Sequence, residues 1–121
     1  MKENKLVDLS FHFAKDIITL VRDLKEKRES IISNQIGRSG TSIGANINEA
    51  QYAQSKADFI SKLQIALKEA NETGYWLKLL FETGYVEEKV FEDLNESCTR
   101  LRVMLITSCK TAKNNMSKDI L

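Results

Sequence analysis

Apolar residues recur every three or four positions along four segments of the chain, and short polar stretches separate these segments. The segments span about residues 5–27, 31–50, 55–83 and 87–114. Side chains at this spacing lie along one face of an α-helix, so each segment is predicted to be an amphipathic helix. Because the connections are short, successive helices should be antiparallel neighbours. The pattern predicts an all-α, antiparallel up-down-up-down four-helix bundle, with one domain over residues 1–121.

The apolar stripes also name the residues expected to form the core of the bundle. In chain order these are Leu6, Leu9, Phe13, Ile17, Leu20, Leu24, Ile32, Ile36, Ile43, Ile47, Phe59, Leu63, Ala66, Ala70, Gly74, Leu77, Phe81, Val90, Leu94, Cys98, Leu101, Leu105 and Ala112. Signals for helix ends agree with these segments. Ser30 is a plausible N-cap, Ser55 with Asp58 has the spacing of a capping box, and Gly84 is a typical helix stop.

Three glycines interrupt the second helical segment. On a helical wheel Ser33, Gly37, Gly40 and Gly44 fall within about 60° of one another, beside the isoleucine stripe. Each glycine costs a helix roughly 1 kcal/mol relative to alanine, so the set needs a compensating gain, such as a second helix that approaches the bare backbone closely. We interpret the four residues as a helix-packing groove and favour a partner within the bundle over one in a neighbouring subunit. The alternative, a phosphate-binding loop, is disfavoured because the glycine spacing fits neither a P-loop nor a dinucleotide-binding fingerprint and no strand pattern precedes it.

Two of the helical segments carry a second apolar patch away from the main stripe. The residues are Val7, Phe11 and Ile18 in the first segment, and Ile65, Trp76, Leu79 and Leu80 in the third. Monomeric proteins rarely expose contiguous apolar patches, and tryptophan is a favoured interface anchor. We predict that these seven residues contribute to an interface of a homo-oligomer. The alternative is that a tilted helix buries them in its own core.

Composition narrows the class of protein further. The apolar content of 42% and net charge of +1 argue against disorder, and the near-neutral charge argues against a dedicated high-affinity nucleic-acid binder. No stretch has the length of a membrane span or the pattern of a signal peptide, so we expect a cytoplasmic protein.

Cys98 and Cys109 are roughly 16 Å apart along one predicted helix, which excludes an internal disulfide. Both are predicted to be reduced core residues.

Charge is polarised along the fourth segment. Its first part is acidic, and its last part holds Arg100, Arg102, Lys110, Lys113 and Lys118 without an acid before residue 119. Complementation of the helix dipole favours this order, although the basic run is longer than the terminal turn on which the dipole acts. In the predicted bundle, the same end receives Lys2, Lys5, Lys56 and Lys62. An oligomer would repeat this end in every subunit, so we predict a basic face suited to weak contact with RNA or DNA.

The sequence contains no recognisable catalytic or metal-binding constellation. His12 has no Glu-x-x-His pair or neighbouring cysteine that would complete a metal site. Ser39, Thr41 and Ser42 have no identifiable basic partner, so nucleophilic catalysis has no support. Glu49 is expected at the solvent or at an interface. We predict neither a cofactor nor a small-molecule substrate.

Several separated motifs resemble those of a known protein family. They are GTSIGANINEA at residues 40–50, QSKADF at 54–59 and ALKEANETGYWL at 66–77. The Phe13-Ala14 and Gly84-Tyr85 pairs extend the resemblance to nearly the whole chain. With these motifs in this order, the chain is similar to the bacterial four-helix-bundle proteins of the 23S rRNA intervening-sequence family.

This resemblance implies an assembly of subunits into a ring, with a homopentamer as the expected form, and it supplies no catalytic residues. Family members include proteins encoded within ribosomal RNA insertions and a relative that assists diversity-generating retroelements. That relative is strongly basic, whereas this chain carries a net charge of +1. The resemblance therefore implies a non-enzymatic homo-oligomeric scaffold, with weak RNA or DNA binding as the alternative function.

Overall fold

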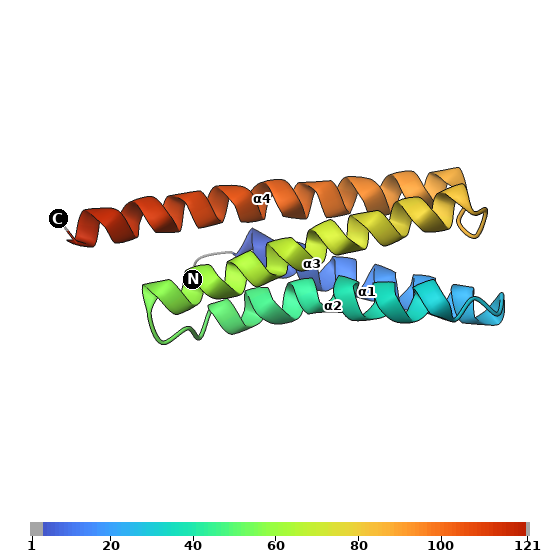
Figure 1. Cartoon of the computed structure of the whole chain (residues 1–121), viewed down its shortest axis with the longest axis horizontal. Helices are drawn as coiled ribbons and strands as arrows, with labels where there is room; N and C mark the ends of the chain where they lie inside the picture. The colour runs from blue at the N-terminus through green and yellow to red at the C-terminus, as the bar shows by residue number, and fades with distance from the viewer. Residues whose placement is uncertain (1–3, 121) are drawn as a thin grey trace.

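The computed structural model describes residues 4–120, with side chains through residue 118. The described residues form four α-helices and no strand: α1 (Lys5–Glu26), α2 (Ile31–Ala50), α3 (Lys56–Glu82) and α4 (Glu88–Ile120). The helices run up and down beside one another, and both ends of the described chain lie at the same end of the molecule (Figure 1). The predicted antiparallel four-helix bundle is confirmed.

The helices occupy the four corners of the bundle in chain order. α2 packs extensively against α1 and α3, and α3 packs against α4, whereas the α1–α4 seam is much less extensive. The diagonal pairs have no comparable contact within the described chain. The bundle therefore has four side faces, and the α1–α2 face lies opposite the α3–α4 face.

Side chains at the helix ends explain where α2 and α3 begin. The hydroxyl of Ser55 accepts a hydrogen bond from the Asp58 backbone N–H at 3.0 Å, as the capping box predicts. At α2 the N-cap residue is Ser30, but its side chain caps nothing. The buried carboxylate of Glu29 instead accepts hydrogen bonds from the backbone N–H groups of residues 31–33, the shortest being 2.7 Å. Glutamate thus stabilises the otherwise unpaired donors of this helix start.

The core of α3 follows a different repeat from the one expected. The buried positions are Ile60, Leu63, Ala66, Ala70, Thr73, Leu77 and Leu80. From Leu63 onward they alternate steps of three and four residues, which is the heptad repeat of a left-handed supercoiled bundle. The expected stripe followed a straight helix, and its members Phe59, Gly74 and Phe81 are only half-buried. The error arises because the stripe was assigned with the period of a straight helix, whereas the observed burial repeats every seven residues.

The fourth helix is longer than predicted and differs at two expected core positions. Val90 is exposed and Ala112 is half-buried, whereas Leu94, Cys98, Leu101, Leu105 and Cys109 are buried. The predicted end near residue 114 falls short of the observed end at Ile120. The C-terminal turns of α4 extend past the first turn of α3, so they have helical neighbours on fewer sides (Figure 1).

Candidate functional site

The glycine-rich face of α2 packs directly against α1. A Cβ atom at Gly40 would lie 2.8 Å from Cγ1 of Ile17, closer than real Cβ contacts allow. At Gly44 it would lie 3.3 Å from the backbone oxygen of Ser10, and at Gly37 it would lie 3.3 Å from Cγ2 of Val21. The groove therefore holds α1 of the same chain, with the closest approach at its centre.

Ser33, the fourth residue assigned to the groove, has a different contact. It is buried, and its hydroxyl donates to the backbone oxygen of Glu29 at 2.8 Å. This bond lies within the first turn of α2, where the Glu29 carboxylate also caps the Ser33 backbone N–H. Ser33 thus stabilises the start of the helix, whereas the three glycines set the distance between α1 and α2.

The seven candidate interface residues differ in exposure. Leu80 is fully buried in the core of its own chain, so its assignment to an interface is wrong. The reason is the heptad repeat of α3, which turns position 80 inward. Trp76 and Leu79 are half-buried and pack against the core, as does Val7 on α1. The clearly exposed members are Phe11 at 65%, Ile18 at 46% and Ile65 at 40%.

Trp76 also takes part in a polar link between α2 and α3. Its indole N–H donates to Oε2 of Glu72 at 3.2 Å, and the Arg38 guanidinium donates to the same oxygen at 3.1 Å. Deeper in this seam, the hydroxyl of Thr73 donates to that of Ser39 at 2.9 Å, with both residues fully buried. Sequence reasoning missed this buried pair, because single polar residues within an apolar stripe give no signal of a partner on another helix.

Two exposed apolar residues on α4 were also missed. Val103 is 57% exposed and Ile106 is 53% exposed, within the stretch of α4 that also carries the basic side chains. Isolated apolar residues are common on protein surfaces, but these two are three positions apart and therefore adjacent on the helix. They form a second apolar patch, separate from the one on α1.

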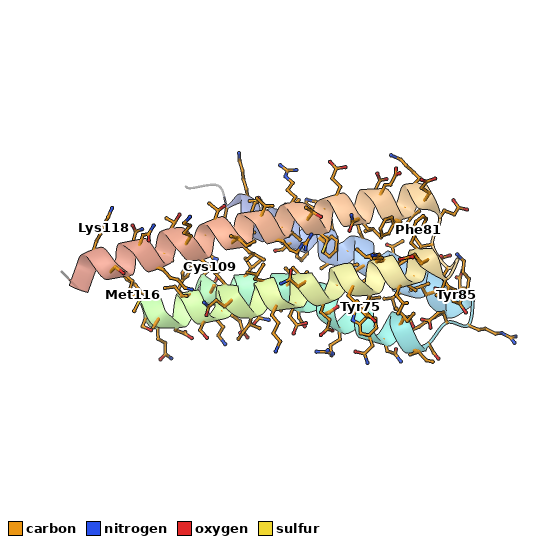
Figure 2. The ribbon with its side chains drawn as sticks, turned by 45° about the horizontal axis from the view of Figure 1, so that its top comes forward. Tyr75, Phe81, Tyr85, Cys109, Met116 and Lys118 are labelled. Carbon is orange, nitrogen blue, oxygen red and sulfur yellow. The ribbon has the colours of Figure 1, made fainter. Side chains whose placement is uncertain are left out.

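The predicted nucleic-acid residues are spread around α4. Arg100, Lys110, Lys113 and Lys118 are exposed, whereas Arg102 is half-buried and donates to the Thr99 hydroxyl at 3.3 Å. On a helical wheel Arg100 and Lys118 point away from the side that carries the other three. Figure 2 shows Lys118 on the part of α4 that extends past the bundle. A compact basic patch thus comprises at most Arg102, Lys110 and Lys113.

Other lysines are found near this end of the bundle. Lys5 and Lys56 begin α1 and α3, and both are exposed. Lys62 forms an ion pair of 3.2 Å with Glu49 on α2, which offsets its charge and gives Glu49 a structural partner. Lys2 lies outside the described residues. The basic end is therefore less uniformly positive than the sequence suggested.

An open groove of about 620 Å³ follows the loose seam between α1 and α4. Its apolar floor includes Leu20, Val86 and Leu94. Its rim is acidic, with Asp16, Asp23, Glu87 and Asp93, and its one basic lining residue is Lys27. The Lys27 ammonium pairs with Asp23 at 3.0 Å and donates to the backbone oxygen of Tyr85 at 3.1 Å.

The cysteines, the histidine and the candidate metal ligands do not form a reactive site within the described residues. Cys98 and Cys109 are free and buried, in agreement with the prediction that they are reduced core residues. Burial raises the pKa of the Cys98 thiol to about 11, and burial also raises the pKa of the Cys109 thiol. Within residues 4–118, no group of three His, Cys, Asp or Glu side chains could hold a metal ion. His12 is exposed. No helix of the described chain is long and apolar enough to cross a membrane.

Comparisons with known proteins agree with the resemblance seen in the motifs. The family model described as 23S rRNA-intervening sequence protein matches residues 2–107. A solved structure from Bacteroides thetaiotaomicron, described as a protein with unknown function from the S23 ribosomal protein family, is 52% identical with a TM-score of 0.85. The match covers 87% of this chain and 98% of that one. None of the curated proteins matches the chain. Lys110, Lys113 and Lys118 lie beyond residues 2–107, the range that the family model matches.

Proposed function

Because the chain belongs to the 23S rRNA-intervening sequence protein family, we propose that it is a non-enzymatic scaffold that joins copies of itself into a homo-oligomer. The observation that carries this proposal is the exposure of Phe11 and Ile18 on one side of α1. Two large apolar side chains seven residues apart occupy the same face of a helix. Contact with another subunit would remove them from water, and each buried side chain of this size contributes roughly 1.5–3 kcal/mol.

The state of the two cysteines supports binding over covalent chemistry. The thiolate is the reactive form of cysteine, and a raised pKa keeps the thiol protonated at neutral pH. Cys98 and Cys109 are buried with raised pKa values, so they are poorly suited to act as nucleophiles. The ring of five subunits implied by the family resemblance remains our expected form of the oligomer.

Size-exclusion chromatography with light scattering tests the proposal at micromolar concentration. We expect a mass of about five times the 13.8 kDa of one chain. A monomer of 13.8 kDa would contradict the scaffold function, whereas a stable assembly of another size would contradict only the pentamer. Phe11→Ala should shift the oligomer towards smaller species, while the helical circular dichroism signal should persist because the residue is exposed.

The exposed lysines near the end of α4 favour a second candidate function, weak binding of RNA or DNA. Lys110 and Lys113 are three residues apart and exposed, and ring assembly would repeat them in every subunit. Each phosphate contact releases counterions, so the affinity should fall steeply as salt is raised. We expect weak affinity for single-stranded RNA at low salt.

A double charge reversal separates this second function from assembly. Lys110→Glu with Lys113→Glu should abolish RNA binding in a fluorescence anisotropy titration and leave the oligomer mass unchanged. Lys68→Glu with Lys78→Glu is the matched control, because it changes the net charge equally at exposed positions of α3. RNA binding that is insensitive to salt, or that the control removes equally, would contradict a role for the basic end.

A further inference from the structure

The exposed residues of α1 lie on the side of that helix next to α2. Phe11, Ile18 and Arg22 are spaced by seven and four residues, so they form one stripe. Val21 borders this stripe, and its Cγ2 atom lies against Gly37 of α2. Around the groove α2 contributes mainly short side chains, including Gly44 and Ala45. On the α1–α2 face, the exposed side chain of Phe11 therefore lies next to a part of α2 that has only short side chains.

A corresponding stripe on α4 belongs to the opposite side of the bundle. Glu92, Glu96 and Val103 are spaced by four and seven residues, and Ile106 lies one turn further on. Ile106 is seven residues before Lys113, which lines a hollow with the first turns of α3. The apolar patch of α4 therefore lies towards its α3 side. With the helices at four corners, this face is opposite the α1–α2 face.

The two stripes lie at matching heights along the bundle. Contacts between successive helices set the register: Ile17 of α1 lies against Gly40 of α2, and the neighbouring Ser39 accepts a hydrogen bond from Thr73 of α3. One turn before Thr73, the carbonyl oxygen of Ala70 accepts a hydrogen bond from Cys98 of α4. The helices α1 and α4 are antiparallel and both rise by about 1.5 Å per residue. This register places Phe11 at about the height of Val103, Arg22 at about that of Glu92, and Ile18 at about that of Glu96.

Charge agrees with the apolar match. The α1 stripe ends in the cation Arg22 and has Lys15 beside it, whereas the α4 stripe carries the carboxylates Glu92 and Glu96. If a second copy is placed on the first in parallel and at the same height, Phe11 faces Val103 and Arg22 faces Glu92, whereas Ile18 faces Glu96 and has no apolar residue opposite it. Inverting the second copy end to end would break both matches, because the apolar and charged parts of each stripe lie at different heights.

From this complementarity, and resting on the proposed homo-oligomer, we infer that the α1–α2 face of each subunit packs on the α3–α4 face of the next, in parallel. Such an interface joins two different surfaces, and it forms a ring when the rotation between subunits closes. Parallel subunits place the C-terminal end of every α4 on the same side of the assembly. The ring thereby gathers Lys110 and Lys113 of all subunits on one face.

Two complementary variants test this arrangement. Phe11→Asp damages the α1–α2 face, and Val103→Asp damages the α3–α4 face; both positions are exposed, so the bundle should fold. Each variant alone should be monomeric by light scattering, since every contact would include one damaged face. An equimolar mixture should form a heterodimer of twice the chain mass and grow no further, because only one pair of intact faces remains. Ile65→Asp is the matched control: Ile65 is seven residues before Glu72, which pairs with Arg38 of α2, so it lies on the α2 side of α3 and outside the inferred α3–α4 face. This variant should assemble like the wild type, so the inference removes Ile65 from the predicted interface.

The outcomes separate this inference from the proposed function. A wild-type monomer would overturn the scaffold itself. An assembled wild type with normally assembling Phe11→Asp or Val103→Asp variants would overturn the inferred faces alone, as would an assembly lost in Ile65→Asp. Monomeric variants that do not combine would also overturn the pairing.

A charge exchange supplies an independent measurement. Arg22→Glu should weaken assembly roughly tenfold in dissociation constant at low salt, and adding Glu92→Arg should restore it. Failure of the second change to restore assembly would overturn the predicted register.

Discussion

The two seams that α1 forms with its neighbours are built in opposite ways. Against α2, glycines remove side chains until the Cβ position of Gly40 would be 2.8 Å from Ile17. Against α4, the helices leave a groove of about 620 Å³ with an acidic rim. Close packing leaves no room for added atoms, whereas an open groove accepts them. The difference predicts that the same kind of substitution has opposite effects on the two sides of one helix.

Gly40→Leu should have the largest effect on stability. Leucine is the better helix former, but overpacking a tight core costs about 1–3 kcal/mol or more. We expect a lower midpoint in urea unfolding followed by circular dichroism. The matched pair is Gly40→Ala and Gly74→Ala, because a Cβ at Gly74 has no atom within 4 Å. Alanine should destabilise the first position and stabilise the second by roughly 1 kcal/mol. A stabilised Gly40→Leu protein would show that the α1–α2 seam is not tight.

The α3–α4 seam, which is closely packed around Cys98, should make the stability of the chain depend on pH. Cys98 donates to the Ala70 carbonyl oxygen at 3.3 Å, and burial raises its thiol pKa from 9.0 to about 11. Because the folded state holds the proton more tightly, the stabilisation is complete below pH 9 and is lost as pH rises towards 11. The loss should be on the order of 2 kcal/mol. Urea unfolding from pH 8 to 11 should show this decrease relative to Cys98→Ala, whereas equal pH dependence would indicate an open, hydrated seam.

Filling the α1–α4 groove should have a smaller effect of the opposite sign. Thr19 lies on the groove and is exposed. Thr19→Leu adds apolar surface there and improves helix propensity, so it should stabilise the chain by up to about 1 kcal/mol. Thermal unfolding of the variant, compared with the wild type, measures the gain. Destabilisation as large as that of Gly40→Leu would mean that the two seams are equally tight.

The smallest effect is expected at the polar contacts of this groove. Lys27 pairs with Asp23 and donates to the Tyr85 carbonyl oxygen, but about half of its side chain is exposed. Exposed ion pairs contribute about 0.2–1 kcal/mol and are screened by salt. Lys27→Ala should therefore cost little in urea unfolding at low salt and still less at 0.5 M sodium chloride. A large cost that persists in salt would show that Lys27 holds the loose seam together.

Local sequence patterns determined much of this architecture. The three-to-four spacing of apolar residues identified four helices, because this spacing puts the apolar side chains on one face of a helix that can be buried. The short connections between them required successive helices to be antiparallel. The three glycines of the second helix predicted a close helix contact, because their cost in helix stability needs a compensating gain. The motifs between residues 40 and 77 were specific enough to indicate the family.

The tertiary structure decided which side of each helix meets which neighbour. The buried positions of α3 follow a seven-residue repeat, so Leu80 belongs to the core and Phe81 is only half-buried. The tertiary structure also decided that α1 occupies the glycine groove. Helix periodicity is a property of one segment, whereas register and pairing depend on how several helices fill space together. For the same reason, the stripes of Phe11 and Val103 could be compared only once four packed helices set them at one height on opposite faces.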